Sequence, residues 1–164
     1  MVRMISEFRP ELAALLPQTD ELLHAAQLTL HDAVCQVTLL GSRGLAGGYH
    51  ATSDIDLSLM VDVNTLPMGE PERGDYLRAV LETTLSRWQS SVDIDLALLF
   101  DQGGCCGLRC FNQRAWDDTI IGSRGTDCFG IYKTQRGFDG YMTQGVRLAS
   151  MYPLLVIWRS FDRS

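Results

Sequence analysis

Two segments of the chain alternate acidic and aliphatic residues, and this pattern limits the fold more than any other feature. In the first segment, residues 54–59, Asp54 and Asp56 alternate with isoleucine and leucine, and in the second Asp93 and Asp95 do the same. A period of two residues is typical of a β-strand with one polar and one apolar face. We therefore predict two strands that each carry two carboxylates on one face.

Further elements are predicted on either side of these strands. Apolar residues spaced three and four apart indicate helices, and short β-branched or apolar runs indicate strands. In chain order they are a helix from 19 to about 34, a strand over 37–40, a helix over 77–88, the second acidic strand over 92–100, a strand over 128–133 and a helix over 142–159 interrupted by Pro153. This order predicts an α/β (α+β) fold, a small mixed β-sheet with flanking helices.

The chain is acidic and of ordinary domain size. Its 164 residues give room for one domain, which we expect to span 1–164, with a motif core at 37–100 and a C-terminal extension of the same domain at 101–164. The formal net charge of −6 disfavours general binding to nucleic acid or to anionic membranes. Charged residues near the N-terminus leave no signal-peptide core, and no stretch reaches the ~18 apolar residues of a membrane span. We expect a cytoplasmic protein.

The chain has five cysteines, three of them close together. Cys105, Cys106 and Cys110 follow a C-C-x3-C spacing, with neither a nearby histidine nor a second cysteine pair to complete a tetrahedral zinc shell. In a cytoplasmic protein the cysteines are expected to stay reduced. Buried or incidental thiols are therefore favoured over a zinc site.

The acidic strands themselves indicate a different kind of metal site. Without a cation, the carboxylates of Asp54, Asp56, Asp93 and Asp95 would repel one another and raise one another's pKa. Oxygen ligands suit a hard ion such as Mg²⁺, which proteins often hold through a few carboxylates and substrate phosphates. The nearest histidine, His50, precedes the first acidic strand by four residues, and the absence of a histidine within the clusters argues against zinc. The alternative is that these acids have no role beyond forming the solvent-exposed polar face of each strand.

A glycine turn comes just before the first acidic strand. The strand over 37–40 ends at Gly41 and Ser42, and a glycine-rich loop over 44–52 follows. Glycine lets a ligand approach the backbone closely, and successive N–H groups with a serine hydroxyl can bind phosphate oxygens. A phosphate site beside a Mg²⁺ site is what metal-assisted phosphoryl or nucleotidyl transfer needs, although glycine turns without function are common.

These residues resemble a known signature. GSRGLAGGYHATSDIDL, residues 41–57, and VDIDLALLF, residues 92–100, resemble the motifs of the DNA polymerase β-type nucleotidyltransferase superfamily, in the same order. With the strand before them they cover roughly 37–100. The resemblance implies that Gly41 and Ser42 bind the triphosphate of an NTP, and that Asp54 and Asp56 are ligands of two Mg²⁺ ions.

The resemblance also implies a third carboxylate, which holds the catalytic metal and draws the acceptor's proton. Asp93 matches it best, with Asp95 as the competitor on the same strand face. Arg43 and Ser53 flank the motif and are expected either to brace the loop or to touch phosphate. Lys133 is expected either to contact the triphosphate or to be an ordinary surface lysine.

The C-terminal part resembles no acceptor-binding domain. Lys133 and Arg136 lie beside a predicted turn at 134–137. Apolar and aromatic residues near the end of the chain are expected in the core or in a subunit interface; they are Tyr152, Leu155, Ile157, Trp158 and Phe161. Because one small domain offers little wall for an acceptor pocket, we expect a homodimer or a partner protein to complete the site.

The resulting hypothesis is a Mg²⁺-dependent nucleotidyltransferase. It would transfer a nucleoside monophosphate from an NTP, with ATP as the expected donor, to a hydroxyl of an antibiotic-like small molecule or a protein, releasing pyrophosphate. The alternative is a non-catalytic nucleotide-binding or antitoxin-type interaction module with the same fold. A D-x-D glycosyltransferase is a weaker third possibility, because it leaves the glycine turn unexplained.

Overall fold

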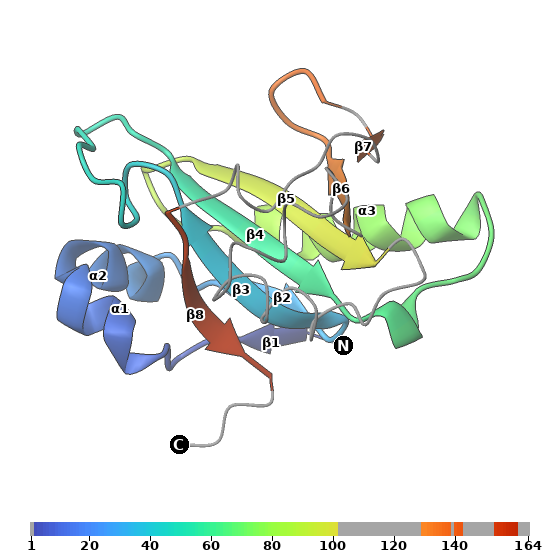
Figure 1. Cartoon of the computed structure of the whole chain (residues 1–164), viewed down its shortest axis with the longest axis horizontal. Coiled ribbons are helices and arrows are strands. Elements are labelled where there is room, and N and C mark those ends of the chain that lie inside the picture. Colours follow the sequence, from blue (N-terminus) through green and yellow to red (C-terminus); the bar gives the residue numbers. More distant parts are fainter. Residues whose placement is uncertain (1, 102–128, 139, 143–152, 161–164) are drawn as a thin grey trace, which may run out of the picture.

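A six-stranded mixed β-sheet forms the centre of the fold (Figure 1). The structure is a computed structural model that describes residues 2–101, 129–138, 140–142 and 153–160. Among the described strands the order is β7-β6-β5-β4-β3-β8, and of these neighbours only β4 and β5 run parallel to each other. The strands are β3 (Val34–Leu40), β4 (Ile55–Val61), β5 (Ile94–Asp101), β6 (Phe129–Lys133), β7 (Gly140–Met142) and β8 (Leu155–Arg159). The expected α+β class is confirmed.

The parallel pair β4 and β5 requires a crossover connection, and a helix supplies it. After the short 3₁₀ turn η1 (Val63–Thr65), helix α3 (Glu72–Leu85) runs behind the sheet (Figure 1) and contacts β5. Leu77, Val80 and Leu81 form its buried side, as its helical spacing predicts. The predicted helix over 77–88 and both acidic strands are thereby confirmed, with shifts of a few residues at their ends.

The predicted helix from 19 to about 34 is wrong beyond residue 25. Helices α1 (Pro10–Leu15) and α2 (Pro17–Ala25) each begin with a proline, which suits the first helical position. After α2 the chain turns at Gln27, whose φ of 55° is left-handed and ends the helix. Strand β2 (Thr29–His31) follows and pairs with β1 (Val2–Met4). The apolar spacing continues past the helix because Leu30 in β2 and Ala33 in the turn before β3 are both buried in the core.

The predicted helix over 142–159 is also wrong in its described parts. Residue 142 ends β7, and residues 155–159 form β8, an edge strand hydrogen-bonded to β3. Its Leu-Val-Ile-Trp sequence has β-branched and aromatic residues that favour a strand once a partner is present. Ile157 is buried in the core, and Leu155 and Trp158 pack against it. Tyr152 and Phe161 lie outside the described residues.

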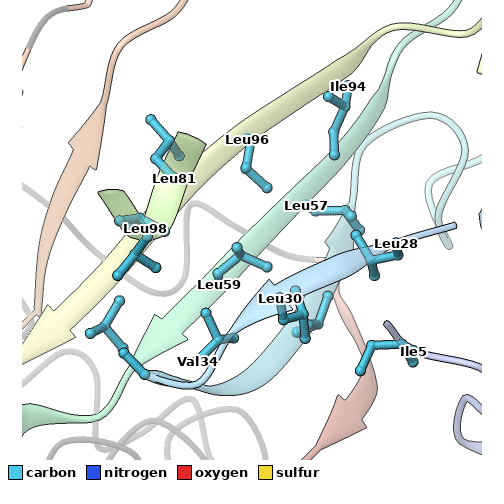
Figure 2. Packing of buried hydrophobic residues seen from close by; sticks show 14 of the residues in the cluster. Ile5, Leu28, Leu30, Val34, Leu57, Leu59, Leu81, Ile94, Leu96 and Leu98 are labelled. Carbon is cyan, nitrogen blue, oxygen red and sulfur yellow. The ribbon is translucent and has the colours of Figure 1, made fainter. Parts of the chain in front are cut away.

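The main hydrophobic cluster lies on one face of the sheet. Leu57 and Leu59 of β4 and Leu96 and Leu98 of β5 point to the same side, where Leu81 of α3 packs against them (Figure 2). Because side chains alternate along a strand, Asp56 and Asp95 point to the opposite face. None of the helices in the described part of the chain is long and apolar enough to cross a membrane.

Candidate functional site

The parallel pairing of β4 and β5 brings two carboxylates side by side. Asp56 and Asp95 are register partners, and the ladder begins with the Ile55 N–H, which donates to the Asp93 carbonyl at 2.9 Å. The Asp95 side chain is only 17% exposed. These two residues therefore form an acidic pair on the sheet face away from the core.

Asp95 affects the ionisation of its neighbour Asp56. Burial, the negative charge of Asp95 and a hydrogen bond with Asp95 together raise the pKa of Asp56 to about 6, while Lys133 acts to lower it. Neighbouring carboxyl groups disfavour double ionisation unless a cation lies nearby. The pair is thus a place where positive charge stabilises the fold.

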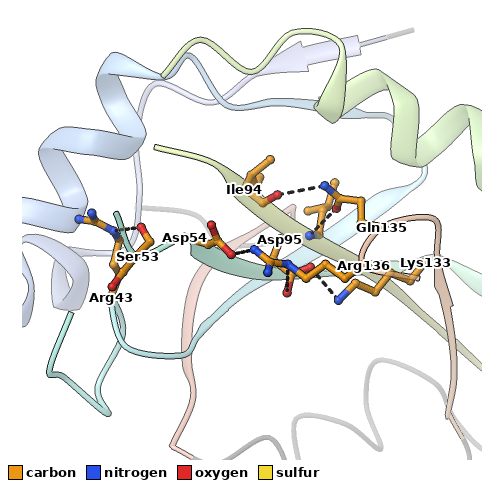
Figure 3. A network of polar contacts seen from close by, with 9 residues as sticks. Arg43, Ser53, Asp54, Ile94, Asp95, Lys133, Gln135 and Arg136 are labelled. Carbon is orange, nitrogen blue, oxygen red and sulfur yellow. Dashed lines mark hydrogen bonds and ion pairs between the residues drawn. The ribbon is translucent and has the colours of Figure 1, made fainter. Parts of the chain in front are cut away.

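Two basic side chains supply positive charge in this structure. Lys133, at the end of β6, places its Nζ 2.7 Å from Asp95 Oδ1. Arg136 forms an ion pair with Asp54, just before β4, and its Nε lies 3.5 Å from Asp95 Oδ2 (Figure 3). We call Asp54, Asp56 and Asp95 the acidic cluster. Lys133 therefore lies against the acidic pair, with its side chain only 15% exposed.

The glycine turn, residues 41–44, lies directly against the acidic cluster. Gly41 has a φ of 72°, and a Cβ added there would overlap the Asp56 carboxylate. The Gly44 N–H donates to the Gly41 carbonyl at 3.0 Å, and the Thr19 hydroxyl of α2 donates to the Arg43 carbonyl at 2.7 Å. A side chain at this position would have to displace the Asp56 carboxylate and adopt a backbone conformation that favours glycine.

Arg43 braces the loop that follows the glycine turn. Its guanidinium, in a residue only 7% exposed, donates to the carbonyls of Ser53 at 2.8 Å and His50 at 3.2 Å (Figure 3). It also lies over the Tyr49 ring, 4.7 Å from the centroid. The Ser53 hydroxyl in turn accepts a hydrogen bond from the His50 N–H at 2.9 Å. Arg43 and Ser53 were expected either to brace the loop or to touch phosphate, and in this structure both of them brace the loop.

The structure does not bring every predicted residue into the cluster. Asp93 is exposed at the start of β5, one step before the paired residues, whereas Asp95 is the register partner of Asp56. Ser42 lies half-buried in the glycine turn. The cysteines at 105, 106 and 110 lie outside the described residues. Cys35 is buried, and burial raises the pKa of its thiol to about 12, so it packs as an inert side chain.

Sequence reasoning missed one residue and the contacts of another. Gln135 bonds to the backbone on both sides of Asp95, and Arg136 bridges two acids of the cluster. Both lie about 40 residues from β5 along the chain. A turn at 134–137 was the only local signal, and it gives no indication of what the turn packs against.

The acidic cluster has the donor chemistry of a Mg²⁺ site. Its ligands would all be carboxylate oxygens, the kind that Mg²⁺ prefers, although the buried Asp95 Oδ1 already lies 2.7 Å from the Lys133 Nζ. Within the described residues, no group of three or more acidic, histidine or cysteine side chains is arranged as a ready metal site. The residues fit the ion chemically, but the cations beside them and the side-chain arrangement would have to adjust.

Comparison of the chain with known proteins gave no match among family models, curated proteins or solved structures.

Proposed function

We propose that the chain is a Mg²⁺-dependent nucleotidyltransferase with the nucleotidyltransferase-like fold of the DNA polymerase β-type superfamily. One observation carries the proposal: Gly41 has no room for a side chain because the Asp56 carboxylate lies against it. The glycine turn and a carboxylate suited to Mg²⁺ are thus adjacent. This is the juxtaposition that a metal-nucleotide complex requires.

In this proposal the residues have distinct roles. The glycine turn, with the backbone of Gly41 and Ser42, binds phosphate oxygens of an NTP, and ATP is the expected donor. Asp54, Asp56 and Asp95 hold Mg²⁺, which would lower the pKa of the acceptor hydroxyl and neutralise the leaving pyrophosphate. Lys133 is a second cation for the triphosphate.

Register favours Asp95 over Asp93 as the third carboxylate. Asp95 pairs with Asp56 across the parallel strands, whereas Asp93 is exposed. In the reaction, the acceptor oxygen forms a bond to the α-phosphorus as the bond to pyrophosphate breaks. The hydroxyl proton passes to Asp95, the role that the resemblance gives to the third carboxylate. The acceptor is a hydroxyl of a small molecule or a protein, and a second copy or a partner chain completes its pocket.

Calorimetric titration of Mg²⁺ and ATP tests the site. We expect Asp56→Asn and Asp95→Asn each to weaken binding of the Mg²⁺-ATP complex at least tenfold, because each removes a charged ligand. Asp93→Asn is the matched control, since it makes the same change two residues away on the same strand, and it should keep the affinity within about twofold. The site is wrong if the wild type binds no nucleotide, or if the Asp56 and Asp95 variants bind it as well as the wild type does.

One observation favours the second candidate, a nucleotide-binding module without catalysis. Lys133 and Arg136 form ion pairs with acids of the cluster and so offset part of its charge without a metal. Such a module would bind ATP equally well with and without Mg²⁺. It would also release no pyrophosphate across a panel of hydroxyl acceptors that includes aminoglycosides and protein side chains.

A further inference from the structure

The turn at residues 134–137 is attached to β5 by a side chain. Ladder pairing between β5 and β6 ends at Leu98 and Tyr132. Beyond that point the Gln135 side chain makes the hydrogen bonds to the β5 backbone that a neighbouring strand would otherwise make. Its Oε1 accepts from the Leu96 N–H at 2.9 Å, and its Nε2 donates to the Ile94 carbonyl at 3.1 Å (Figure 3). The two bonds lie on either side of Asp95. The peptide groups that carry Asp95 are therefore fixed by Gln135.

The same attachment sets the position of Arg136. The Phe138 N–H donates to the Gln135 carbonyl at 3.0 Å, and Arg136 and Gly137 have φ values of 55° and 82°. A left-handed conformation is unfavourable for arginine and needs support from its surroundings. Here the support is the Gln135 clamp on one side and the ion pair with Asp54 on the other.

The two basic side chains beside the acidic cluster differ in how exposed they are to solvent. Lys133 lies on a strand, and its side chain is 15% exposed; Arg136 lies on the turn, and its side chain is 52% exposed. Exposed ion pairs contribute little free energy and are readily exchanged for other ions. Arg136 is thus the cation that can leave, while Lys133 stays beside Asp95.

Charge balance supports such an exchange. When all three acids of the cluster are ionised and Arg136 has moved away, three carboxylates and Lys133 leave a charge of −2. One divalent cation offsets that charge. With Arg136 in place, the cluster has a charge of only −1, which attracts the cation less. The Asp54 carboxylate would also still be paired with Arg136 and not free to bind the cation.

We propose that Gln135 and Arg136 act as positioning residues for the acidic cluster, with Gln135 seating the Arg136 guanidinium on Asp54 and Asp95 as an internal counter-ion that a divalent cation displaces. This rests on the proposed function only in taking these acids as metal ligands. Arg136 holds the acids in place before the metal arrives, and its displacement makes metal binding competitive with an intramolecular ion pair.

Binding of Mn²⁺ alone, followed through the electron paramagnetic resonance signal of the free ion, tests the proposal without nucleotide. We expect Arg136→Gln to bind Mn²⁺ about two- to fivefold more tightly than the wild type, the range an exposed ion pair allows. Arg136→Gly, which suits the left-handed backbone, should give the same gain. Arg78→Gln on α3 removes the same charge behind the sheet and should change the affinity by less than about 1.5-fold, because salt screens distant charges.

The role of Gln135 is tested by a double-mutant cycle. In a Gln135→Ala background, Arg136→Gln should improve Mn²⁺ affinity by less than about 1.5-fold, because the guanidinium is no longer seated. An equal gain in both backgrounds would overturn the role of Gln135. Unchanged or weaker Mn²⁺ binding in the Arg136 variants, or no Mn²⁺ binding by any variant, would overturn the whole proposal. Pyrophosphate release is measured separately, so this inference and the proposed function can fail independently.

Discussion

Two arginines hold the two loops beside the acidic cluster, and they do so in opposite ways. Arg43 is 7% exposed and directs its guanidinium to the carbonyls of Ser53 and His50. The side chain of Arg136 is 52% exposed and directs its guanidinium to the carboxylates of Asp54 and Asp95. One arginine is part of the loop's internal structure, and the other is part of the site's charge balance.

The difference shows how burial decides what a charged side chain can do. A buried guanidinium must keep its hydrogen bonds, since leaving it or its partners unpaired costs free energy. An exposed guanidinium can exchange a carboxylate for water at little cost. The loop over 41–54 is therefore expected to be fixed, and the turn at 134–137 to be the part that responds to ligands.

The largest expected effect is the loss of stability when the buried arginine, Arg43, is replaced. Arg43→Met should lower the free energy of unfolding by about 3 kcal/mol, because several carbonyls lose a charge-assisted donor. Arg136→Met, the matched change in the other loop, should lower it by less than about 1 kcal/mol. Urea unfolding of both variants measures the difference. Equal losses would show that the two arginines are not distinct.

The next effect concerns the glycine turn. Gly41→Ala should cost about 2 kcal/mol or more and weaken binding of the Mg²⁺-ATP complex, because its Cβ would displace the Asp56 carboxylate. Gly47→Ala is the matched control: it has the same φ of 72°, but nothing lies within 4 Å of the added Cβ. It should lose about 1 kcal/mol and leave nucleotide binding unchanged. If both variants bind nucleotide alike, the contact with Asp56 has no role in binding.

A smaller effect follows from the pKa of Asp56. The pKa is about 6 in the folded chain and near 3.9 when unfolded, so the folded state binds more protons between these values. Stability should therefore fall as pH rises from about 4 to 6, by about 1 kcal/mol once solvent screening is allowed for. Asp56→Asn should remove this fall and leave the chain more stable than the wild type at pH 7.

Urea unfolding from pH 4 to pH 8, without metal, measures that difference. Asp93→Asn serves as the control and should keep the slope of the wild type. A difference between the Asp56→Asn and wild-type curves that does not change with pH would contradict the perturbed pKa.

The smallest effect isolates the backbone of Arg136. Arg136→Gly should be more stable than Arg136→Ala by somewhat less than about 1 kcal/mol, because glycine adopts the left-handed φ of 55° without strain. Both variants lose the ion pair, so their difference reports the backbone alone. Equal stability in thermal unfolding would mean that the turn relaxes once the arginine side chain is gone.

Local patterns predicted the central elements well. The alternating acids gave β4 and β5, and the spacing of Leu77, Val80 and Leu81 gave α3, because each pattern matches the repeat of its own element. The helix prediction failed after Ala25, where Gln27 turns the chain into a strand. It failed again at β8, whose conformation depends on pairing with β3, a partner more than 100 residues earlier.

The kind of residues in the candidate site could be predicted from the sequence, but which acids pair across the strands could not. Period two placed Asp93 and Asp95 on one face, but only the pairing across the α3 crossover shows that Asp95 is the partner of Asp56. For Lys133 the sequence allowed both a triphosphate contact and an ordinary surface position, and only the fold places its Nζ beside Asp95. Gln135 had no local signal, because its bonds are made to the backbone of β5, where any sequence offers the same groups.

The most direct test is a crystal structure with Mn²⁺ and a non-hydrolysable ATP analogue, in which anomalous scattering locates the ion. The account predicts Mn²⁺ bound by oxygens of Asp56 and Asp95, with phosphates on the backbone of Gly41 and Ser42 and Arg136 moved away from Asp54. Mn²⁺ elsewhere, or a nucleotide bound without contact to the glycine turn, would contradict it.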